Sequence, residues 1–280
     1  MTLRFLGTGT SVGVPQIGCD CPVCTSDDPR DKRRRCGAYV TSGDTAVLID
    51  TPPELRLACV EYGIAKVDAV LLTHAHMDHI AAFDDVRRFN TLNGVRVPCA
   101  PGDPQYRGLA WRIVGKSLDC YALPETIEAM HHIFPYISAQ GASNGLYRPQ
   151  IEFIDNTRAF SVGSIAVKAF RVEHSFPCCG YLLEDRLNGS RLGYVSDCHD
   201  LSDQVIAALE GVDVMAIDCL RIREHPTHLT LERAKEYLAR IKPKRAFLTH
   251  ICHDLKHSQW QQMLSASAID VAYDGLAVDL

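Results

Sequence analysis

The stretch Asp68-Ala69-Val70-Leu71-Leu72-Thr73-His74-Ala75-His76-Met77-Asp78-His79 dictates how this chain folds and where its chemistry lies. Its first half has the length and apolar composition of a buried strand, so the polar residues follow directly at the carboxyl end of that strand. Three imidazoles and a carboxylate within six residues are candidate metal ligands. On a tight turn, His74 and His76 can point one way while Asp78 and His79 point another, which suits two metal ions in one site.

The length and composition indicate an ordinary globular protein. The 280 residues can bury a large core, and we expect a single domain over residues 1–280. No apolar run could cross a membrane, and the N-terminus lacks the features of a signal peptide, so we expect a cytoplasmic protein with no membrane partner. The net charge of −5 argues against a nucleic-acid polymer as partner. A small anionic substrate would need local positive charge, which bound metals can supply.

Twelve cysteines are many for a reducing compartment, where they are expected as thiols or metal ligands rather than disulfides. Three of them stand in the cluster Cys19-Asp20-Cys21-Pro22-Val23-Cys24. Three thiolates suit a closed tetrahedral zinc that needs one more ligand, which must come from elsewhere in the chain. The alternative interpretation is a loop with three unligated cysteines.

Further candidate ligands follow other predicted strands. His174 comes after the strand 166–172, Asp197 ends the strand 192–197, and His250 ends the strand 244–250. Asp197 could bridge two cations, because each carboxylate oxygen can bind one. Strands and helices alternate along the chain, which predicts a layered α/β fold with these ligands collected at one sheet edge.

The loop 221–230 offers two more histidines, His225 and His228, just before a helix expected at 231–241 with Thr230 as its N-cap. Two cations in such a site would deprotonate water and clamp phosphate oxygens, while a further histidine assists the leaving group. The residues alone leave the hydrolysis of an ester, an amide or a phosphodiester open.

The central motif, together with Asp197 where zinc-dependent lactamases usually carry a cysteine, resembles the phosphodiesterase branch of the metallo-β-lactamase superfamily. More specifically, the chain resembles the PhnP-like phosphodiesterases. This resemblance implies a four-layer αββα sandwich and the hydrolysis of cyclic phosphates. It also implies two divalent metals, zinc or manganese with iron or nickel as other candidates, held by His74, His76, Asp78, His79, His174, Asp197 and His250.

The same resemblance implies a structural zinc knuckle near residues 19–24. The family closes this knuckle with a histidine three residues after the last active-site histidine, which here is His253, so the implied ligands are Cys19, Cys21, Cys24 and His253. It further implies that His228 is the catalytic histidine, with His225 as the rival. Asp78 and Asp197 are expected to take part in catalysis as metal-binding carboxylates.

We therefore expect a metal-dependent phosphodiesterase that hydrolyses small cyclic or diester phosphates, cyclic ribose and nucleoside phosphates included, with a hydroxide bridging two metals. Two alternatives stay open: a nuclease of the tRNase Z type and a non-hydrolytic metal-binding protein of the PqqB type. The first of these uses a long protruding arm to hold tRNA, and we expect this chain to lack one.

The region 100–151 is longer than the family pattern, so the rim of the site and the choice of substrate are left open. We expect a helical stretch over 104–116 within it. The aromatic and irregular stretch from Met130 to Arg148 is expected to form a flap over the site or a dimer contact, and its aromatic part, Phe134 to Tyr147, favours a homodimer.

Overall fold

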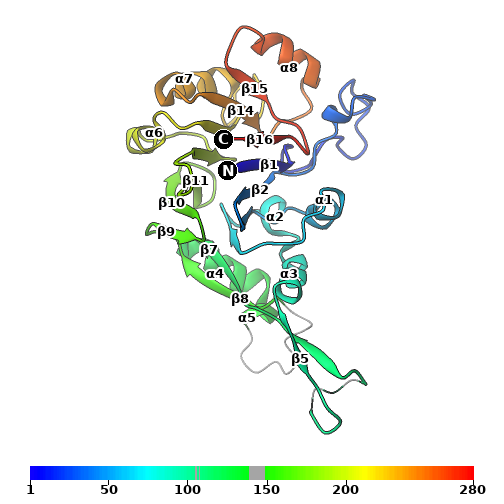
Figure 1. Ribbon diagram of the computed structural model, residues 1–280. Coiled ribbons are helices and arrows are strands. Elements are labelled where there is room, and N and C mark those ends of the chain that lie inside the picture. The colour runs from blue at the N-terminus through cyan, green and yellow to red at the C-terminus, as the bar shows by residue number, and fades with distance from the viewer. Residues whose placement is uncertain (105, 107, 139–148) are drawn as a thin grey trace.

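The computed structural model describes residues 1–104, 106, 108–138 and 149–280, and within these the strands form two seven-stranded sheets and a separate two-stranded one (Figure 1). The first sheet contains, in spatial order, β16 (Ala277–Asp279), β1 (Thr2–Gly7), β2 (Gly37–Ser42), β3 (Thr45–Ile49), β4 (Ala69–Leu71), β7 (Leu118–Ala122) and β8 (Ile151–Asp155). The second contains β15 (Ile269–Val271), β14 (Arg245–Thr249), β13 (Val214–Asp218), β12 (Arg191–Val195), β11 (Cys178–Asp185), β10 (Ile165–Val172) and β9 (Phe160–Val162).

Helices cover the outer face of each sheet. The first sheet carries α1 (Leu55–Glu61), α2 (Met77–Ile80), η2 (Phe83–Val86), α3 (Arg87–Leu92), α4 (Pro124–Ile133) and α5 (Pro135–Ser138). The second carries α6 (Asp203–Leu209), α7 (Leu231–Ile241) and α8 (His257–Leu264). A short turn of helix, η1 (Pro29–Asp31), lies in the N-terminal loop. None of the helices among the described residues is both long and apolar enough to span a membrane.

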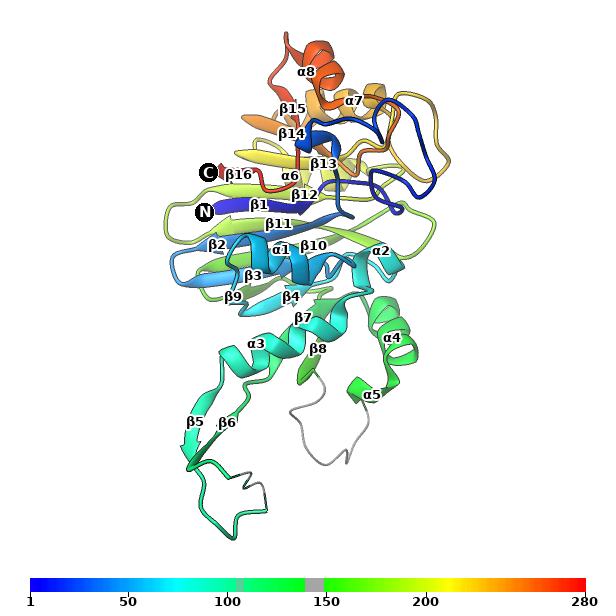
Figure 2. The ribbon, with the colours of Figure 1, turned by 90° about the vertical axis from the view of Figure 1, so that its right-hand side faces the viewer.

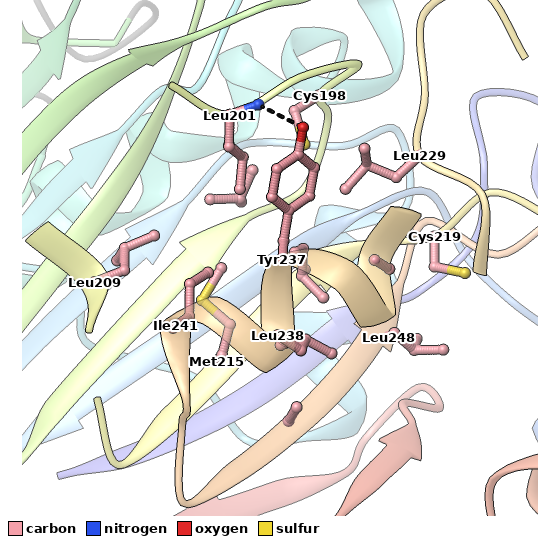
Figure 3. Close-up of a cluster of buried hydrophobic side chains, with 14 of the residues drawn as sticks. Cys198, Leu201, Leu209, Met215, Cys219, Leu229, Tyr237, Leu238, Ile241 and Leu248 are labelled. Atoms are coloured by element: carbon pink, nitrogen blue, oxygen red, sulfur yellow. Dashed lines mark hydrogen bonds between the residues drawn. The ribbon is translucent and has the colours of Figure 1, made fainter. Parts of the chain in front are cut away.

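Three large hydrophobic cores separate the four layers. Side chains alternate between the two faces of a strand, so Val47 and Ile49 of β3 enter the core between the sheets while Leu48 enters the core beneath the helices. The third core lies between the second sheet and its helices, where Tyr237 and Leu238 of α7 pack (Figure 3). The expected αββα sandwich is therefore confirmed.

Helix α7 occupies the expected residues, and the Thr230 side chain caps its first turn by accepting a hydrogen bond from the Arg233 amide at 3.3 Å. The helix expected over 104–116 is wrong. Residues Trp111–Val114 form β6, which pairs with β5 (Val95–Pro98) in a hairpin that projects from the body (Figure 2). The chain thus carries an arm that the sequence did not lead us to expect.

The aromatic stretch expected to form a flap or a homodimer contact is described only in part. Phe134 is buried at the end of α4, and the Tyr136 hydroxyl donates a hydrogen bond to Asp84 at 2.9 Å. Residues 139–148 lie outside the described residues. The homodimer therefore stays a prediction.

Candidate metal centre and catalytic site

The candidate ligands gather where strands of both sheets end. Strands β3 and β4 run parallel in the first sheet, and β12, β13 and β14 run parallel in the second. The carboxyl ends of parallel strands share one sheet edge. The turn after β4 supplies four ligands, and the second sheet supplies His174, Asp197 and His250 from the ends of β10, β12 and β14.

A first cluster consists of three histidines. The Nδ1 atom of His76 lies 2.9 Å from Nε2 of His74 and 3.4 Å from Nε2 of His174. His174 donates a hydrogen bond from Nδ1 to the Thr227 carbonyl at 2.9 Å, which leaves its Nε2 with a lone pair for a cation. Burial lowers the pKa of all three imidazoles, so they stay in the neutral form that binds metals.

A second cluster contains Asp78, His79 and His250. Oδ2 of Asp78 lies 3.3 Å from Nε2 of His79 and 3.7 Å from Nε2 of His250. Asp197 lies between the two clusters, with Oδ2 at 3.2 Å from Nε2 of His79 and Oδ1 at 3.1 Å from Nε2 of His250. A carboxylate oxygen of Asp197 also lies within 4.8 Å of ring nitrogens of His74 and His79. Asp197 is thus positioned to contact cations in both clusters.

Several atoms of this centre need a partner that the described residues do not supply. His79 Nε2, His250 Nε2 and Asp197 Oδ2 are buried and make no hydrogen bond within the described part of the chain. A buried polar atom without a partner costs about 1–3 kcal/mol. Imidazoles and carboxylates are the donors that zinc, manganese and iron accept, so the residues fit divalent cations.

Asp50 supports the centre and was missed from the sequence. It is buried at the end of β3 with a left-handed backbone (φ 62°). Its Oδ2 accepts a hydrogen bond from His79 Nδ1 at 2.7 Å, and its Oδ1 accepts the Thr73 amide at 2.8 Å. A carboxylate on the far nitrogen fixes the tautomer of a ligand histidine and directs Nε2 at the metal position.

Asp218, also missed from the sequence, orients His228. His228 donates from Nδ1 to Asp218 Oδ2 at 3.0 Å, and this oxygen also accepts the amides of Cys198 and Leu229. Although burial opposes it, the Asp218 carboxylate raises the pKa of His228 to about 9, so the imidazole is charged at neutral pH. The His228 ring stacks on that of His250 with centroids 4.6 Å apart.

His225 lies next to His228, on the side of the cavity. Its ring centroid is 5.1 Å from that of His228, and its Nδ1 accepts a hydrogen bond from the Thr227 amide at 3.3 Å. The ligand atom of His228 lies within 4.8 Å of those of His174 and Asp197. Both histidines line a cavity of about 580 Å³ that has room for a small organic group beside the centre.

The predicted knuckle residues also converge, although they come from opposite ends of the chain. The Sγ atoms of Cys19, Cys21 and Cys24 lie 3.4, 3.5 and 3.4 Å from Nδ1 of His253. Bond lengths of about 2.3 Å to sulfur and 2.0 Å to nitrogen place such atoms about 3.5 Å apart around a tetrahedral zinc. The four side chains therefore fit a structural zinc.

Residues 45–251 match the family model of the beta-lactamase superfamily domain. The chain belongs to the metallo-β-lactamase superfamily. A crystal structure of a diphosphatase from the PhnP family is 33% identical, with a TM-score of 0.81 over 100% of this chain and 97% of that one, so this superfamily member is PhnP-like.

Two further relatives lie at lower identity. An octanoyltransferase of Porphyromonas gingivalis is 29% identical over 99% of this chain and 51% of its own length, so the chain spans about half of that protein. The zinc-bound structure of PqqB from Methylobacterium extorquens is 20% identical, with a TM-score of 0.75 over all of both chains, and shows the shared fold. The superfamily fold implies divalent metal ions, and together with the PhnP-family neighbour it supports a metal-dependent hydrolase.

Proposed function

We propose that this superfamily member is a phosphodiesterase that uses two divalent cations to hydrolyse small cyclic or diester phosphates. The observation that carries the proposal is the position of Asp197, whose two oxygens lie near both ligand clusters. The cations are zinc or manganese, and the ligands are His74, His76, Asp78, His79, His174, Asp197 and His250. A third cation, zinc, would be held in the knuckle by Cys19, Cys21, Cys24 and His253.

Two bound cations would supply Lewis acidity and bring the pKa of water towards neutrality. The chain's own residues hold the reacting groups in place. Asp78 and Asp197 add two negative charges to the ligand set, which favours hard, oxygen-binding cations and therefore phosphate oxygens as substrate ligands.

His228 acts as the proton donor to the leaving oxygen. Its Nδ1–H is hydrogen-bonded to Asp218, so the proton on Nε2 is the one that can be donated to the leaving oxygen. Because the pKa of His228 is raised to about 9, Nε2 keeps this proton at neutral pH. General acid catalysis of this kind typically contributes about 10²–10⁴ in rate. The cavity lined by His225 and His228 is the place where the leaving group would lie.

Measured turnover of bis(p-nitrophenyl) phosphate and of 2′,3′-cyclic nucleotides, with metal content determined on the same sample, tests the proposal. We expect about two active-site equivalents of metal and hydrolysis of both substrates. Full metal content without turnover of either substrate would contradict it and would favour a non-hydrolytic protein of the PqqB type.

A nuclease of the tRNase Z type is the second candidate, and the projecting hairpin is the feature that favours it. In this arm the Arg96 guanidinium lies 4.3 Å from the centroid of the Trp111 ring, and Trp111 is exposed. Cationic and aromatic side chains together bind single-stranded RNA. Cleavage of a precursor tRNA at physiological salt, lost when the hairpin is replaced by a short turn, would support this candidate.

A further inference from the structure

His250, the candidate metal ligand after β14, has a backbone conformation that is uncommon for residues other than glycine. It follows β14 with φ of 61°, in the left-handed region. This conformation costs free energy for any residue with a Cβ atom, and it persists only where the surrounding structure holds it. The segments that contact residues 249–253 therefore determine where the His250 imidazole points.

The residues on either side of His250 are held by backbone hydrogen bonds. Before it, the Thr249 carbonyl accepts the Cys219 amide at 3.0 Å. After it, the Ile251 amide donates to the Thr8 carbonyl at 2.8 Å, and the Ile251 carbonyl accepts the Thr10 amide at 3.2 Å. The N-terminal loop thus hydrogen-bonds both the amide and the carbonyl of Ile251, the residue next to His250.

The knuckle is a second contact between the N-terminal loop and the segment 249–253. His253 lies three residues after His250, and its Nδ1 lies within 3.5 Å of the Sγ atoms of Cys19, Cys21 and Cys24. These cysteines continue the loop that contains Thr8 and Thr10. A tetrahedral zinc in the knuckle would lock the N-terminal loop onto the segment that carries His250.

We propose that the knuckle is a positioning device for His250, so that its ligand set controls the affinity of one of the two active-site cation positions. The proposal rests on the two-cation centre proposed above. The affected position is the one formed by Asp78, His79 and His250. When the knuckle opens, His250 is free to leave its left-handed conformation. The position then keeps Asp78, His79 and the shared Asp197 but loses a well-placed His250.

The other position takes no ligand from the segment 249–253. His74 and His76 belong to the turn after β4, and His174 is held by the Thr227 carbonyl. The ion pair between Arg223 and Asp254 leads from the knuckle towards the loop of Thr227, but the Arg223 side chain is 71% exposed. Exposed pairs contribute little, so the effect is expected to be confined to one position.

Titration of the full chain with Mn²⁺, followed by electron paramagnetic resonance, tests the coupling without reference to activity. After a chelator has removed the bound metals, one equivalent of Zn²⁺ is returned to refill the thiolate-rich knuckle. Mn²⁺ prefers oxygen and nitrogen ligands to thiolates, so it then reports on the active-site positions. For His253→Ala we expect one equivalent to bind as in the wild type and the other to bind about 10–100-fold more weakly, as when a group that orients a ligand is lost. His253→Cys, which offers four thiolates, should restore most of the affinity.

The matched control is His132→Ala, which removes an exposed histidine from α4 and should change neither equivalent. Circular dichroism shows whether each variant is folded, and if His253→Ala is not, Cys19→Ser is titrated in its place and should weaken the same single equivalent. Wild-type binding of both equivalents, or equal weakening of both, overturns the proposal. Failure of the wild type itself to bind two equivalents would instead overturn the proposed function.

Discussion

Replacing Asp218 by asparagine should change how the activity depends on pH. Burial opposes the charged form of His228, but the Asp218 carboxylate, with smaller contributions from Asp197 and Asp78, raises its pKa from 6.5 to about 9. At pH 7.5 an imidazole with a pKa of about 9 is about 97% protonated, whereas one returned to 6.5 is about 9% protonated. The asparagine variant should therefore lose about tenfold in kcat/KM at pH 7.5 for a substrate that needs protonation of its leaving group.

The assay compares kcat/KM of variant and wild type from pH 6 to pH 9 with two phosphodiesters, one with an alkyl and one with a p-nitrophenyl leaving group. The loss of kcat/KM in the variant should shrink below pH 6.5, where His228 is protonated in both proteins. The loss should also be smaller for the p-nitrophenyl substrate, because p-nitrophenol leaves readily as an anion. The control is Asp200→Asn, because Asp200 lines the same cavity but pairs with Arg233. A deficit that is the same at every pH would refute the reasoning.

The same carboxylate makes stability depend on pH. A raised pKa in the folded state means that the stabilisation is complete below pH 6.5 and is lost as the pH rises through about 9. The shift is worth at most about 3–4 kcal/mol, and the His228 side chain is 12% exposed, so solvent screening reduces this value little. Urea unfolding of the metal-free protein at pH 6.5 and 9.5 should show this slope in the wild type and not in Asp218→Asn.

Three other changes give distinct outcomes. His228→Ala should keep its metal content and lose about 10²-fold or more in kcat/KM on an alkyl phosphodiester, and intact turnover would exclude the assigned role. Asp50→Ala should bind one active-site cation about 10–100-fold more weakly, measured by competition with a chelator, because His79 loses the partner of its Nδ1. Leu238→Ala, in the core of Figure 3, should reduce the unfolding free energy by about 2–5 kcal/mol in urea, and a loss below 1 kcal/mol would contradict close packing there.

Most of the fold and most of the candidate metal ligands could be predicted from the sequence, because the ligands lie where apolar strands end. His74, Asp197 and His250 each follow a largely apolar strand. The convergence of Asp197 and His250 needed only parallel strands within one sheet, whereas their meeting with His74 also needed the two sheets to pack with these strand ends on the same side. Asp50 and Asp218 carry the same signal, since each ends an apolar strand with a carboxylate. They were missed because their role depends on which imidazole nitrogen they face, and spacing along the chain does not contain that information.

The error over residues 104–116 has a local cause. Trp111, Ile113 and Val114 are aromatic and β-branched residues that favour strands, and they lie in a stretch bounded by Gly108 and Gly115. The helix prediction gave too little weight to these glycines. The pairing with β5 then depends on residues about fifteen positions away, which a reading of the local window does not include.

The ligands come from both halves of the sandwich, with His74, His76, Asp78 and His79 on one sheet and His174, Asp197 and His250 on the other. Any cation bound there joins the two halves across their seam, and the unfolded chain has no comparable site. The melting temperature should therefore rise with the logarithm of free metal concentration, since a ligand at 100 times its Kd adds about 2.7 kcal/mol to folding. The concentration of free metal in the cell would then set the thermodynamic stability of the protein as well as its activity.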